Sequence, residues 1–298
     1  MQANRKPLKR FVVDPLTALA AALVYAVFWL MPLDLASAVG GALGRCVGPR
    51  LAVSRRARRN LKHAFPEKSD GEIAAIERGM WDNLGRIVGE YPHLPRIQIY
   101  APDGRFEVVG AEYVDLLRDD AKPGIFFSAH IGNWEALSLT ATQRGLALDQ
   151  VYRAANNRLA AWLFIRARAV GDGALIAKGA DGARQLLRSL RDGKHIAMLV
   201  DQKMNDGIAV KFFGRDAMTA PALAELALRY DCPVVPSRVV RLAGARFRMV
   251  VEPPLAFRPT GERHADVAAM MAMVNEKLES WIRETPEQWL WLHNRWPD

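Results

Sequence analysis

Cysteine is scarce in this sequence. The 298 residues include only Cys46 and Cys232, far apart in the chain, which argues against a disulfide framework and excludes the CxxC spacing of many metal sites. A reducing compartment fits this usage. No serine or cysteine stands in a GxSxG nucleophile elbow, the context in which hydrolases of one large class expose their nucleophile. Internal repeats and low-complexity linkers are also missing.

Negative charge is in deficit. The sequence has 41 Lys and Arg residues but only 32 Asp and Glu residues, which gives a formal net charge of +9 and a pI near 9.8. A chain of this kind favours anionic partners: nucleic acid, phospholipid surfaces, phosphorylated substrates or an acidic carrier protein. No recognised nucleic-acid-binding motif appears, and the basic residues are spread along the chain. Half of the residues are apolar, enough for one large core or two small ones.

Charge is absent altogether from residues 15–33, PLTALAAALVYAVFWLMPL. A bilayer-spanning helix needs about 20 apolar residues, so this segment predicts an N-terminal hydrophobic membrane-anchor helix. A buried core helix is the alternative, and Pro32 would permit a shallow or re-entrant insertion instead of a crossing. A cleaved signal peptide is disfavoured because the small-residue cleavage site is poorly marked.

Basic residues flank this apolar segment on both sides. The positive-inside rule therefore does not decide whether the segment crosses the bilayer, but the pattern suits a protein lying against an anionic cytoplasmic leaflet. We divide the chain into an N-terminal hydrophobic anchor and basic helix over residues 1–60 and an α/β domain over residues 61–298.

From residue 105 onward, short apolar runs alternate with helical patterns. Such alternation predicts an α/β fold, with a mixed, mostly parallel sheet flanked by helices on both faces. The runs 233–241 and 246–252 are joined by a short turn and predict an antiparallel hairpin. A long helix is expected near 263–284. Strands are expected at 106–110, 124–129, 150–153, 174–177 and 195–200, with helices near 111–119, 133–145, 156–170, 181–191 and 221–231.

One apolar run ends at a histidine, in the stretch FFSAHIGNWEAL at 126–137. In sheets of this kind, ligands bind beyond the carboxyl ends of the strands, which is where His130 falls. If His130 lies in the turn and Glu135 in the first turn of the next helix, the carboxylate can accept a hydrogen bond from one ring nitrogen and make the other more basic. Asn133 is a suitable helix cap. The alternative is a structural histidine beside a helix-start glutamate, because HxxxxE is short and common.

The block HIGNWE resembles the HxxxxD/E block of the glycerolipid acyltransferase superfamily, in the form found in the late acyltransferases of lipid A biosynthesis, the lauroyl/myristoyl branch. Further stretches resemble that branch in the right order and cover nearly the whole chain. One departure is Ala154, which stands where the family's VYRPxxN segment has proline. The stretches are RRNLKHAFPE (58–67), VYRAANN (151–157), RAR (166–168), DQ (201–202), VKFFGRDAMTAPA (210–222) and PEQWLWLHNRW (286–296).

The resemblance implies a glycerolipid acyltransferase-like fold and the transfer of an acyl chain from acyl carrier protein to a hydroxyl of a 3-hydroxyacyl chain on a lipid A precursor. His130 would act as general base and Glu135 would orient it. No metal or organic cofactor is implied, because the donor is a phosphopantetheine thioester on the carrier. The implied location is the bacterial inner membrane, with the catalytic domain on the cytoplasmic side and anionic lipids as partners.

Six further residues are candidates for substrate binding. The arginines suit the phosphates and acidic sugars of such an acceptor, because guanidinium groups bind phosphate bidentately. Arg153 lies at the end of one expected strand, and the aspartate and glutamine follow another. By the rule that ligands bind at strand ends, all three fall on the same edge of the sheet; a structural role fits the aspartate as well. The candidates are Asn133, Arg153, Arg166, Arg168, Asp201 and Gln202.

Two other functions stay open at this level. One is acyl transfer to another membrane lipid, such as a lysophospholipid or a phosphoinositol mannoside. The other is a non-enzymatic, membrane-anchored basic binding protein. The remaining histidines are weaker candidates: His63, His93, His195 and His264 are interpreted as structural or solvated, and His293 lies in the tryptophan-rich end of the chain. Core packing or an interfacial belt would explain Trp289, Trp291 and Trp296.

Overall fold

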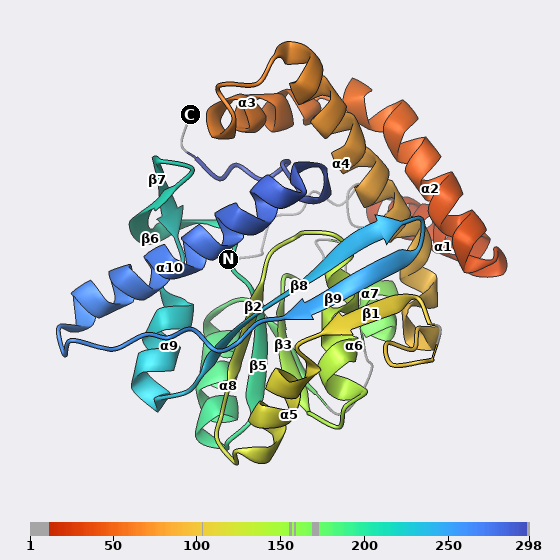
Figure 1. Cartoon of the computed structure of the whole chain (residues 1–298). Helices are drawn as coiled ribbons and strands as arrows, with labels where there is room; N and C mark the ends of the chain where they lie inside the picture. Colours follow the sequence, from red (N-terminus) through yellow and green to blue (C-terminus); the bar gives the residue numbers. More distant parts are fainter. Residues whose placement is uncertain (1–11, 103, 155–156, 158, 169–172, 297–298) are drawn as a thin grey trace.

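The computed structural model describes residues 12–102, 104–154, 157, 159–168 and 173–296. Its centre is a seven-stranded sheet in the order β1-β9-β8-β2-β5-β3-β4, with helices on both faces (Figure 1). The neighbouring strands pair in parallel, except for the antiparallel pair of β8 and β9. The predicted mixed, mostly parallel α/β sheet is therefore confirmed. The strands are β1 Phe106–Val109, β2 Ile125–Ser128, β3 Leu148–Tyr152, β4 Leu175–Ala177, β5 His195–Leu199, β8 Val234–Ala243 and β9 Arg246–Val251.

Alternating side chains of the central strands feed two separate cores. In β2, Ile125 and Phe127 belong to one cluster, whereas Phe126 belongs to the other, because successive side chains of a strand point to opposite faces. The first cluster contains side chains of α8, α9 and α10, and the second contains side chains of α5 and α6. Burial on both faces explains why β2 is an unbroken apolar run. The helices after β1 are α5 Ala111–Asp119, α6 Leu137–Thr142, α7 Ala161–Arg168, α8 Ala180–Arg191, α9 Ala222–Tyr230 and α10 Arg263–Glu284.

Four helices precede the sheet: α1 Asp14–Leu30, α2 Leu33–Val47, α3 Ser54–Ala64 and α4 Asp70–Glu90. Ser69 and Glu72 form a capping box at the start of α4. Helices α2 and α4 lie side by side (Figure 1), and glycines allow their backbones to meet. A Cβ on Gly85 would stand only 2.1 Å from the carbonyl oxygen of Gly40.

The apolar segment at 15–33 is divided between two helices. Helix α1 ends at Leu30 and Pro32 is extended with φ −56° and ψ 144°, after which α2 begins. Neither α1 nor any other helix in the described residues has the length and apolarity that a bilayer crossing requires. The predicted transmembrane anchor helix is therefore not supported. Proline is the physical reason for the break, since it disfavours helical backbone in the residue before it.

One element was not expected. No strand is expected between the run at 195–200 and the helix near 221–231, but β6 Lys203–Phe212 and β7 Arg215–Thr219 form a separate two-stranded antiparallel sheet. Polar residues at 203–207 hid the first strand, and its register is irregular between Lys203 and Ile208. The predicted hairpin of β8 and β9 and the long helix α10 are both confirmed.

Short 3-10 turns complete the chain: η2 Gly48–Arg50, η3 Tyr91–Arg96, η4 Trp134–Ala136 and η5 Pro286–Gln288. After η5 the C-terminal segment runs back past the end of β2. An isolated bridge joins Ile131 to Trp289, and the Leu290 N–H donates to the His130 carbonyl. Trp289, Trp291 and Trp296 are buried in the core, so of the two explanations for these tryptophans, packing is correct and an interfacial belt is wrong.

Candidate functional site

The register of the two central strands places the key groups side by side. Ser128 of β2 pairs with Leu199 of β5, so the residues two positions further on, His130 and Asp201, emerge together from the carboxyl edge of the sheet. The His130 Nδ1 atom lies 2.8 Å from Asp201 Oδ1, and the His130 backbone N–H donates to Asp201 Oδ2 at 2.9 Å. One carboxylate therefore holds both the ring and the backbone of the histidine.

Asp201 is fully buried yet well supplied with donors. Trp289 Nε1 donates to its Oδ2 at 2.8 Å, in addition to the two contacts from His130. Burial by itself would raise the pKa of Asp201, but the charge and hydrogen bonds of His130 outweigh burial and hold this pKa below its usual value. An ionised Asp201 requires a hydrogen on His130 Nδ1, which leaves the lone pair of Nε2 available as a base.

Glu135 does not have the expected partner. Both of its carboxylate oxygens accept hydrogen bonds from Arg168, at 2.7 Å from Nε and 2.6 Å from Nη2. The predicted hydrogen bond between His130 and Glu135 is therefore wrong: Asp201 is the carboxylate that holds the ring. The cause is the loop after β2, in which Gly132 adopts a left-handed φ of +57° and η4 begins as a 3-10 turn, so that Glu135 faces α7. Although burial opposes it, the bonds and charge of Glu135 raise the pKa of Arg168.

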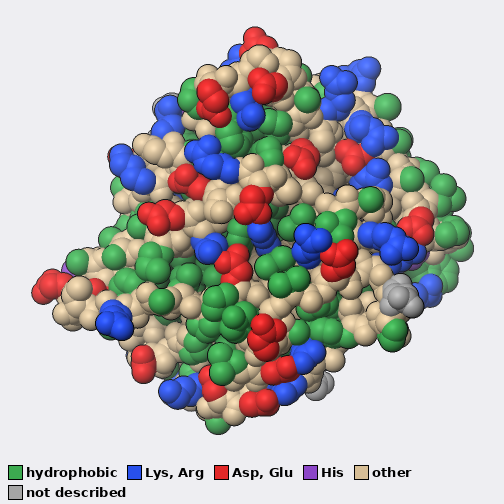
Figure 2. Space-filling model, viewed as in Figure 1, with side chains coloured by type: hydrophobic (Ala, Val, Ile, Leu, Met, Phe, Trp, Pro, Cys, Tyr) green, Lys and Arg blue, Asp and Glu red, His purple; other side chains and the backbone are tan. Residues whose placement is uncertain are grey.

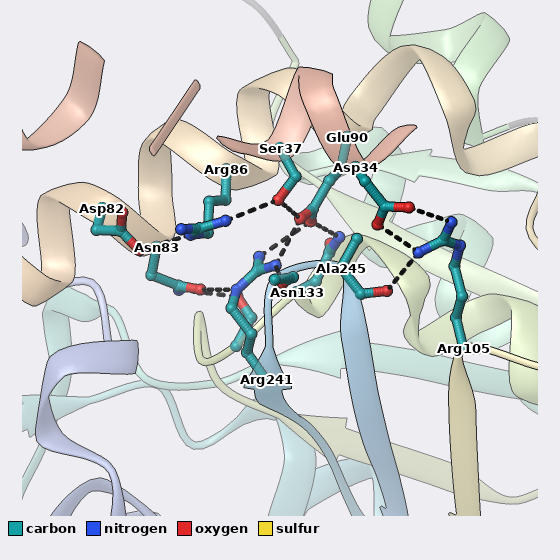
Figure 3. Close-up of polar contacts among 12 residues, drawn as sticks. Asp34, Ser37, Asp82, Asn83, Arg86, Glu90, Arg105, Asn133, Arg241 and Ala245 are labelled. Atoms are coloured by element: carbon teal, nitrogen blue, oxygen red, sulfur yellow. Dashed lines mark hydrogen bonds and ion pairs between the residues drawn. The ribbon is translucent and has the colours of Figure 1, made fainter. Parts of the chain in front are cut away.

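Asn133 is also placed differently from the expectation. It is buried, its side chain caps no helix, and its Nδ2 donates to Glu90 Oε2 at 2.8 Å. Figure 3 shows the surrounding network: Arg241 of β8 forks onto Glu90 of α4, and Ser37 of α2 donates to the same carboxylate. Asn133 thus supports the histidine loop, by which we mean residues 129–133 between β2 and η4. It is not among the residues that line the cavity.

The same loop is fastened at its glycine. A Cβ on Gly132 would stand 1.7 Å from the Val239 carbonyl oxygen, and its left-handed φ favours glycine in any case. The Gly132 carbonyl accepts a hydrogen bond from Asn83 Nδ2 at 3.0 Å, and its N–H donates to Gln288 at 3.1 Å. Elements far apart in sequence therefore fix the position of His130.

A cavity of about 170 Å³ opens beside His130. Its mouth is polar, and its interior continues between the sheet and helices α5 and α6 along apolar side chains. Arg153, Arg168 and Gln202, three of the candidates for substrate binding, line the cavity, and so does Lys178, which was not among the candidates. Arg166 belongs to α7, and its side chain lies outside the part of the chain that the structure describes. The apolar lining includes Val114, Phe126, Leu148, Ala197, Met249 and Val251.

Two missed residues had signals of different strength. Lys178 directly follows β4, so the strand-end rule that selected Arg153 would also have found it. His293 lies in an irregular segment, and no periodicity points to it. Its ring centroid lies 5.0 Å from that of His130, and its Nε2 lies 3.2 Å from Gln202 Nε2. Within the described ranges, no group of three or more His, Cys, Asp or Glu side chains is arranged to hold a metal ion.

A buried carboxylate, an oriented imidazole and an adjoining apolar cavity define a site suited to general-base chemistry on an apolar substrate. Residues 6–298 match the protein family described as bacterial lipid A biosynthesis acyltransferases, and the chain belongs to that family.

Known proteins similar to this chain carry related names. A lipid A biosynthesis acyltransferase of Haemophilus influenzae is 23% identical over 88% of this chain and 81% of its own length. A lipid A biosynthesis palmitoleoyltransferase of Escherichia coli is 25% identical over 90% and 88%. Among solved structures, the 1-acyl-sn-glycerophosphate acyltransferase PlsC from Thermotoga maritima aligns with a TM-score of 0.35 at 12% identity, covering 96% of this chain and 100% of that one.

Proposed function

We propose that this protein transfers a fatty acyl chain from the phosphopantetheine thioester of acyl carrier protein to a hydroxyl of a 3-hydroxyacyl chain on a lipid A precursor. The observation that carries the proposal is the pairing of His130 with buried Asp201 at the mouth of an apolar cavity, in a chain of the lipid A acyltransferase family. The cavity has the character that an acyl chain requires, because its interior is hydrocarbon and its mouth is polar.

The reaction follows from the tautomer of His130. Nε2 takes the proton of the acceptor hydroxyl while the hydroxyl oxygen attacks the thioester carbonyl carbon. Asp201 stabilises the imidazolium that forms. The tetrahedral oxyanion then collapses, the carbon–sulfur bond breaks, and the phosphopantetheine sulfur leaves with the proton held by His130. No covalent acyl-enzyme is needed, because the hydroxyl itself is the nucleophile.

Cations at the mouth suit an acceptor that carries phosphates. Arg153 and Lys178 both line the cavity, and they directly follow β3 and β4, the two strands beyond β5 in the sheet. Arg168 is held by Glu135 in a largely buried ion pair. We therefore propose that Arg168 mainly shapes the wall of the site and contributes less than Arg153 and Lys178 to binding the acceptor phosphates. Glu135 is given the same wall-forming role, acting through Arg168.

We also propose that the protein attaches to the cytoplasmic face of the bacterial inner membrane and that its N-terminal helices lie in the membrane interface. Helix α1 exposes an apolar face, and Figure 2 shows hydrophobic side chains gathered at the right-hand edge, over α1 and α2. Arg96 stacks on Trp29 at 5.2 Å from the ring centroid, which places a cation beside this face. An exposed apolar helix surface with a basic residue beside it suits an anionic interface. The exposed residues include Leu16, Leu19, Leu23, Val27, Leu30, Leu35, Leu43 and Val47.

Product analysis by mass spectrometry tests the proposal. The purified protein is given acyl carrier protein thioesters and, in separate reactions, a lipid A precursor, a lysophosphatidate and a phosphoinositol mannoside. We expect one acyl chain to be added to the lipid A precursor, and we expect His130→Ala to abolish the addition while the variant stays folded. If acyl transfer occurs only to another acceptor, that acceptor takes the place of the lipid A precursor in the proposal. If acyl transfer occurs to none of the three acceptors, a binding protein is favoured.

A further inference from the structure

Gln202 links two imidazoles at the mouth of the cavity. Its Nε2 atom lies 3.3 Å from Nε2 of His130 and 3.2 Å from Nε2 of His293, and the two rings are arranged edge to face. His293 has no role in the mechanism above, although its ring centroid lies 5.0 Å from that of the base. The arrangement therefore calls for an account of what the second histidine does.

The hydrogens in this cluster can be assigned one after another. Asp201 holds a hydrogen on His130 Nδ1, so His130 Nε2 is an acceptor while the ring is neutral. The group opposite must then be a donor, which fixes the amide nitrogen of Gln202 toward His130. That nitrogen carries a second hydrogen, directed at His293 Nε2, so His293 Nε2 must also be an unprotonated acceptor. The chain Asp201, His130, Gln202, His293 is consistent only with this pattern.

The geometry points to a shared role: we propose that Gln202 is the donor that stabilises the oxyanion of the tetrahedral intermediate, and that His293 is the positioning residue that holds its amide in place. This inference rests on the proposed acyl transfer. In the resting site one Gln202 N–H occupies the lone pair of the base. When the acceptor hydroxyl takes that place, the N–H is released beside the carbonyl oxygen that becomes negatively charged.

The balance of the step is simple. The proton of the hydroxyl moves to His130, an oxygen–carbon bond forms, and the carbonyl π electrons move to the oxygen, which accepts the hydrogen bond of Gln202. No proton leaves Gln202 at any stage. As the carbon–sulfur bond breaks, the carbonyl re-forms and the amide returns to His130. A neutral amide suits this position because it stabilises the oxyanion without a charge that would oppose formation of the imidazolium.

His293 is held in the state that this role needs. The pKa of His293 is lowered to about 4. Burial is the largest cause, followed by the electrostatic effect of His130; Lys178 and Arg153 act in the same direction, and Asp201 opposes them. The ring is therefore neutral at pH 7 and can accept from Gln202. Its backbone is fixed as well, because Asn60 Nδ2 donates to the His293 carbonyl at 2.6 Å.

A double-mutant cycle tests whether the two residues act as one unit. In the acyl-transfer assay we expect Gln202→Ala and His293→Phe each to lower kcat about 10²-fold, the loss typical of one oxyanion donor, with KM little changed. The double variant should be no slower than either single variant, because both remove the same donor. His293→Gln keeps an acceptor oxygen and should recover most of the rate. If the losses of the two single variants multiply in the double variant, or if either single variant has a normal kcat, the proposal is overturned.

Nitrogen NMR of the histidine rings provides a test that does not depend on activity. At pH 7 we expect His293 to be neutral with its hydrogen on Nδ1, and Gln202→Ala to change the Nε2 signal of both His130 and His293. A hydrogen on His293 Nε2 at pH 7 would refute the arrangement. If the wild-type protein transfers no acyl chain, the proposed function fails. If it does transfer and His293→Phe is as fast, only this inference fails.

Discussion

At the scale of single residues, the choice of carboxylate decides how the histidine works. Glu135 is close to His130 in sequence, and Asp201 is distant, yet Asp201 makes the contacts with the ring and the backbone N–H. A carboxylate that contacts only the ring would leave its tilt free. Asp201 contacts two points and is itself held by Trp289, so it fixes both the tautomer and the orientation of the base.

We expect Asp201→Asn to lower kcat by about 10³- to 10⁴-fold, the size of loss seen when a histidine base is forced into the wrong tautomer. The asparagine side chain has only one acceptor oxygen, which the His130 N–H and Trp289 Nε1 occupy in place of Asp201 Oδ2. Its NH2 group then faces His130 Nδ1 as a donor, so His130 should carry its hydrogen on Nε2 instead. Acyl-transfer kinetics would measure the loss, and ring-nitrogen NMR would report the tautomer.

Glu135→Gln serves as the matched control for that experiment. It weakens the buried ion pair with Arg168, which should lower the melting temperature, since a buried charge that loses its partner is costly. The tautomer of His130 should stay as in the wild type. If instead Glu135→Gln changes the tautomer and Asp201→Asn does not, our assignment of the partner is wrong.

At the scale of elements, close backbone contacts and the ends of strands organise the site. Helix α4 connects the parts: it packs against α2 through glycines, and it supplies Glu90 to the network that holds Asn133 and Arg241 (Figure 3). The position of the histidine loop thus depends on how the two helices pack.

Gly85→Ala tests this packing. Because the added Cβ would stand 2.1 Å from the Gly40 carbonyl oxygen, α2 and α4 must separate, and we expect a loss of about 1–3 kcal/mol in the free energy of unfolding. Gly71→Ala in the first turn of the same helix is the control. Its Cβ would meet nothing closer than 3.9 Å, so it should be neutral or stabilising. Urea unfolding of both variants would measure the difference, and equal stability would contradict the close contact.

The strands also bound the cavity, and we expect them to set acyl length. Val251 lines the cavity from β9, two strands across the sheet from β2. Val251→Trp should fill that end and shift the preferred donor to shorter chains. The measurement is the product ratio from a mixture of thioesters of different length. Val109→Trp, at an exposed position of β1, should leave the ratio unchanged. An unaltered ratio in Val251→Trp would place the acyl chain elsewhere.

At the scale of the whole molecule, buried imidazoles link stability to pH. Burial is the leading cause that lowers the pKa of His63, His195 and His293 in the folded protein. The unfolded chain, with histidine pKa values near 6.5, therefore binds more protons than the folded one between about pH 6.5 and pH 4. Stability is highest above that range and falls as the pH decreases through it.

We therefore expect the free energy of unfolding to fall on acidification from pH 7.5 to 4.5, before most carboxylates are protonated. Urea titrations at several pH values would show it. His195→Gln should reduce the slope, because it removes one of the three groups. A stability that stays constant over this range, or rises on acidification, would show that these imidazoles are not buried as described.

Attachment to a bilayer is likewise a property of the whole surface. We expect Leu19→Glu combined with Leu23→Glu, both exposed on α1, to reduce sedimentation with anionic vesicles by at least about tenfold, because charged groups are costly in the apolar part of the interface. Leu116→Glu is the control, at an exposed position on α5. Equal binding by all three proteins would locate the membrane contact elsewhere.

Much of the architecture could be predicted from the sequence because it depends on local periodicity. The apolar runs at 106–110 and 195–200 and the pattern at 263–284 mark strands and a helix that the structure contains. The strand-end rule also selected Arg153, Asp201 and Gln202 correctly as neighbours of one cavity or of its base. The β6–β7 hairpin was missed because its first residues are polar and carry no period-2 pattern.

The sequence by itself determined the class of fold, the edge of the sheet where His130 lies and the absence of a covalent nucleophile motif, since each depends on nearest neighbours along the chain. Only the tertiary structure decided the partners: Asp201 for His130, Arg168 for Glu135, and Gln202 with His293 at the base. These contacts depend on strand register, on one left-handed glycine and on the returning C-terminal segment. They join residues far apart in the chain, and spacing along a sequence carries no information about such distances.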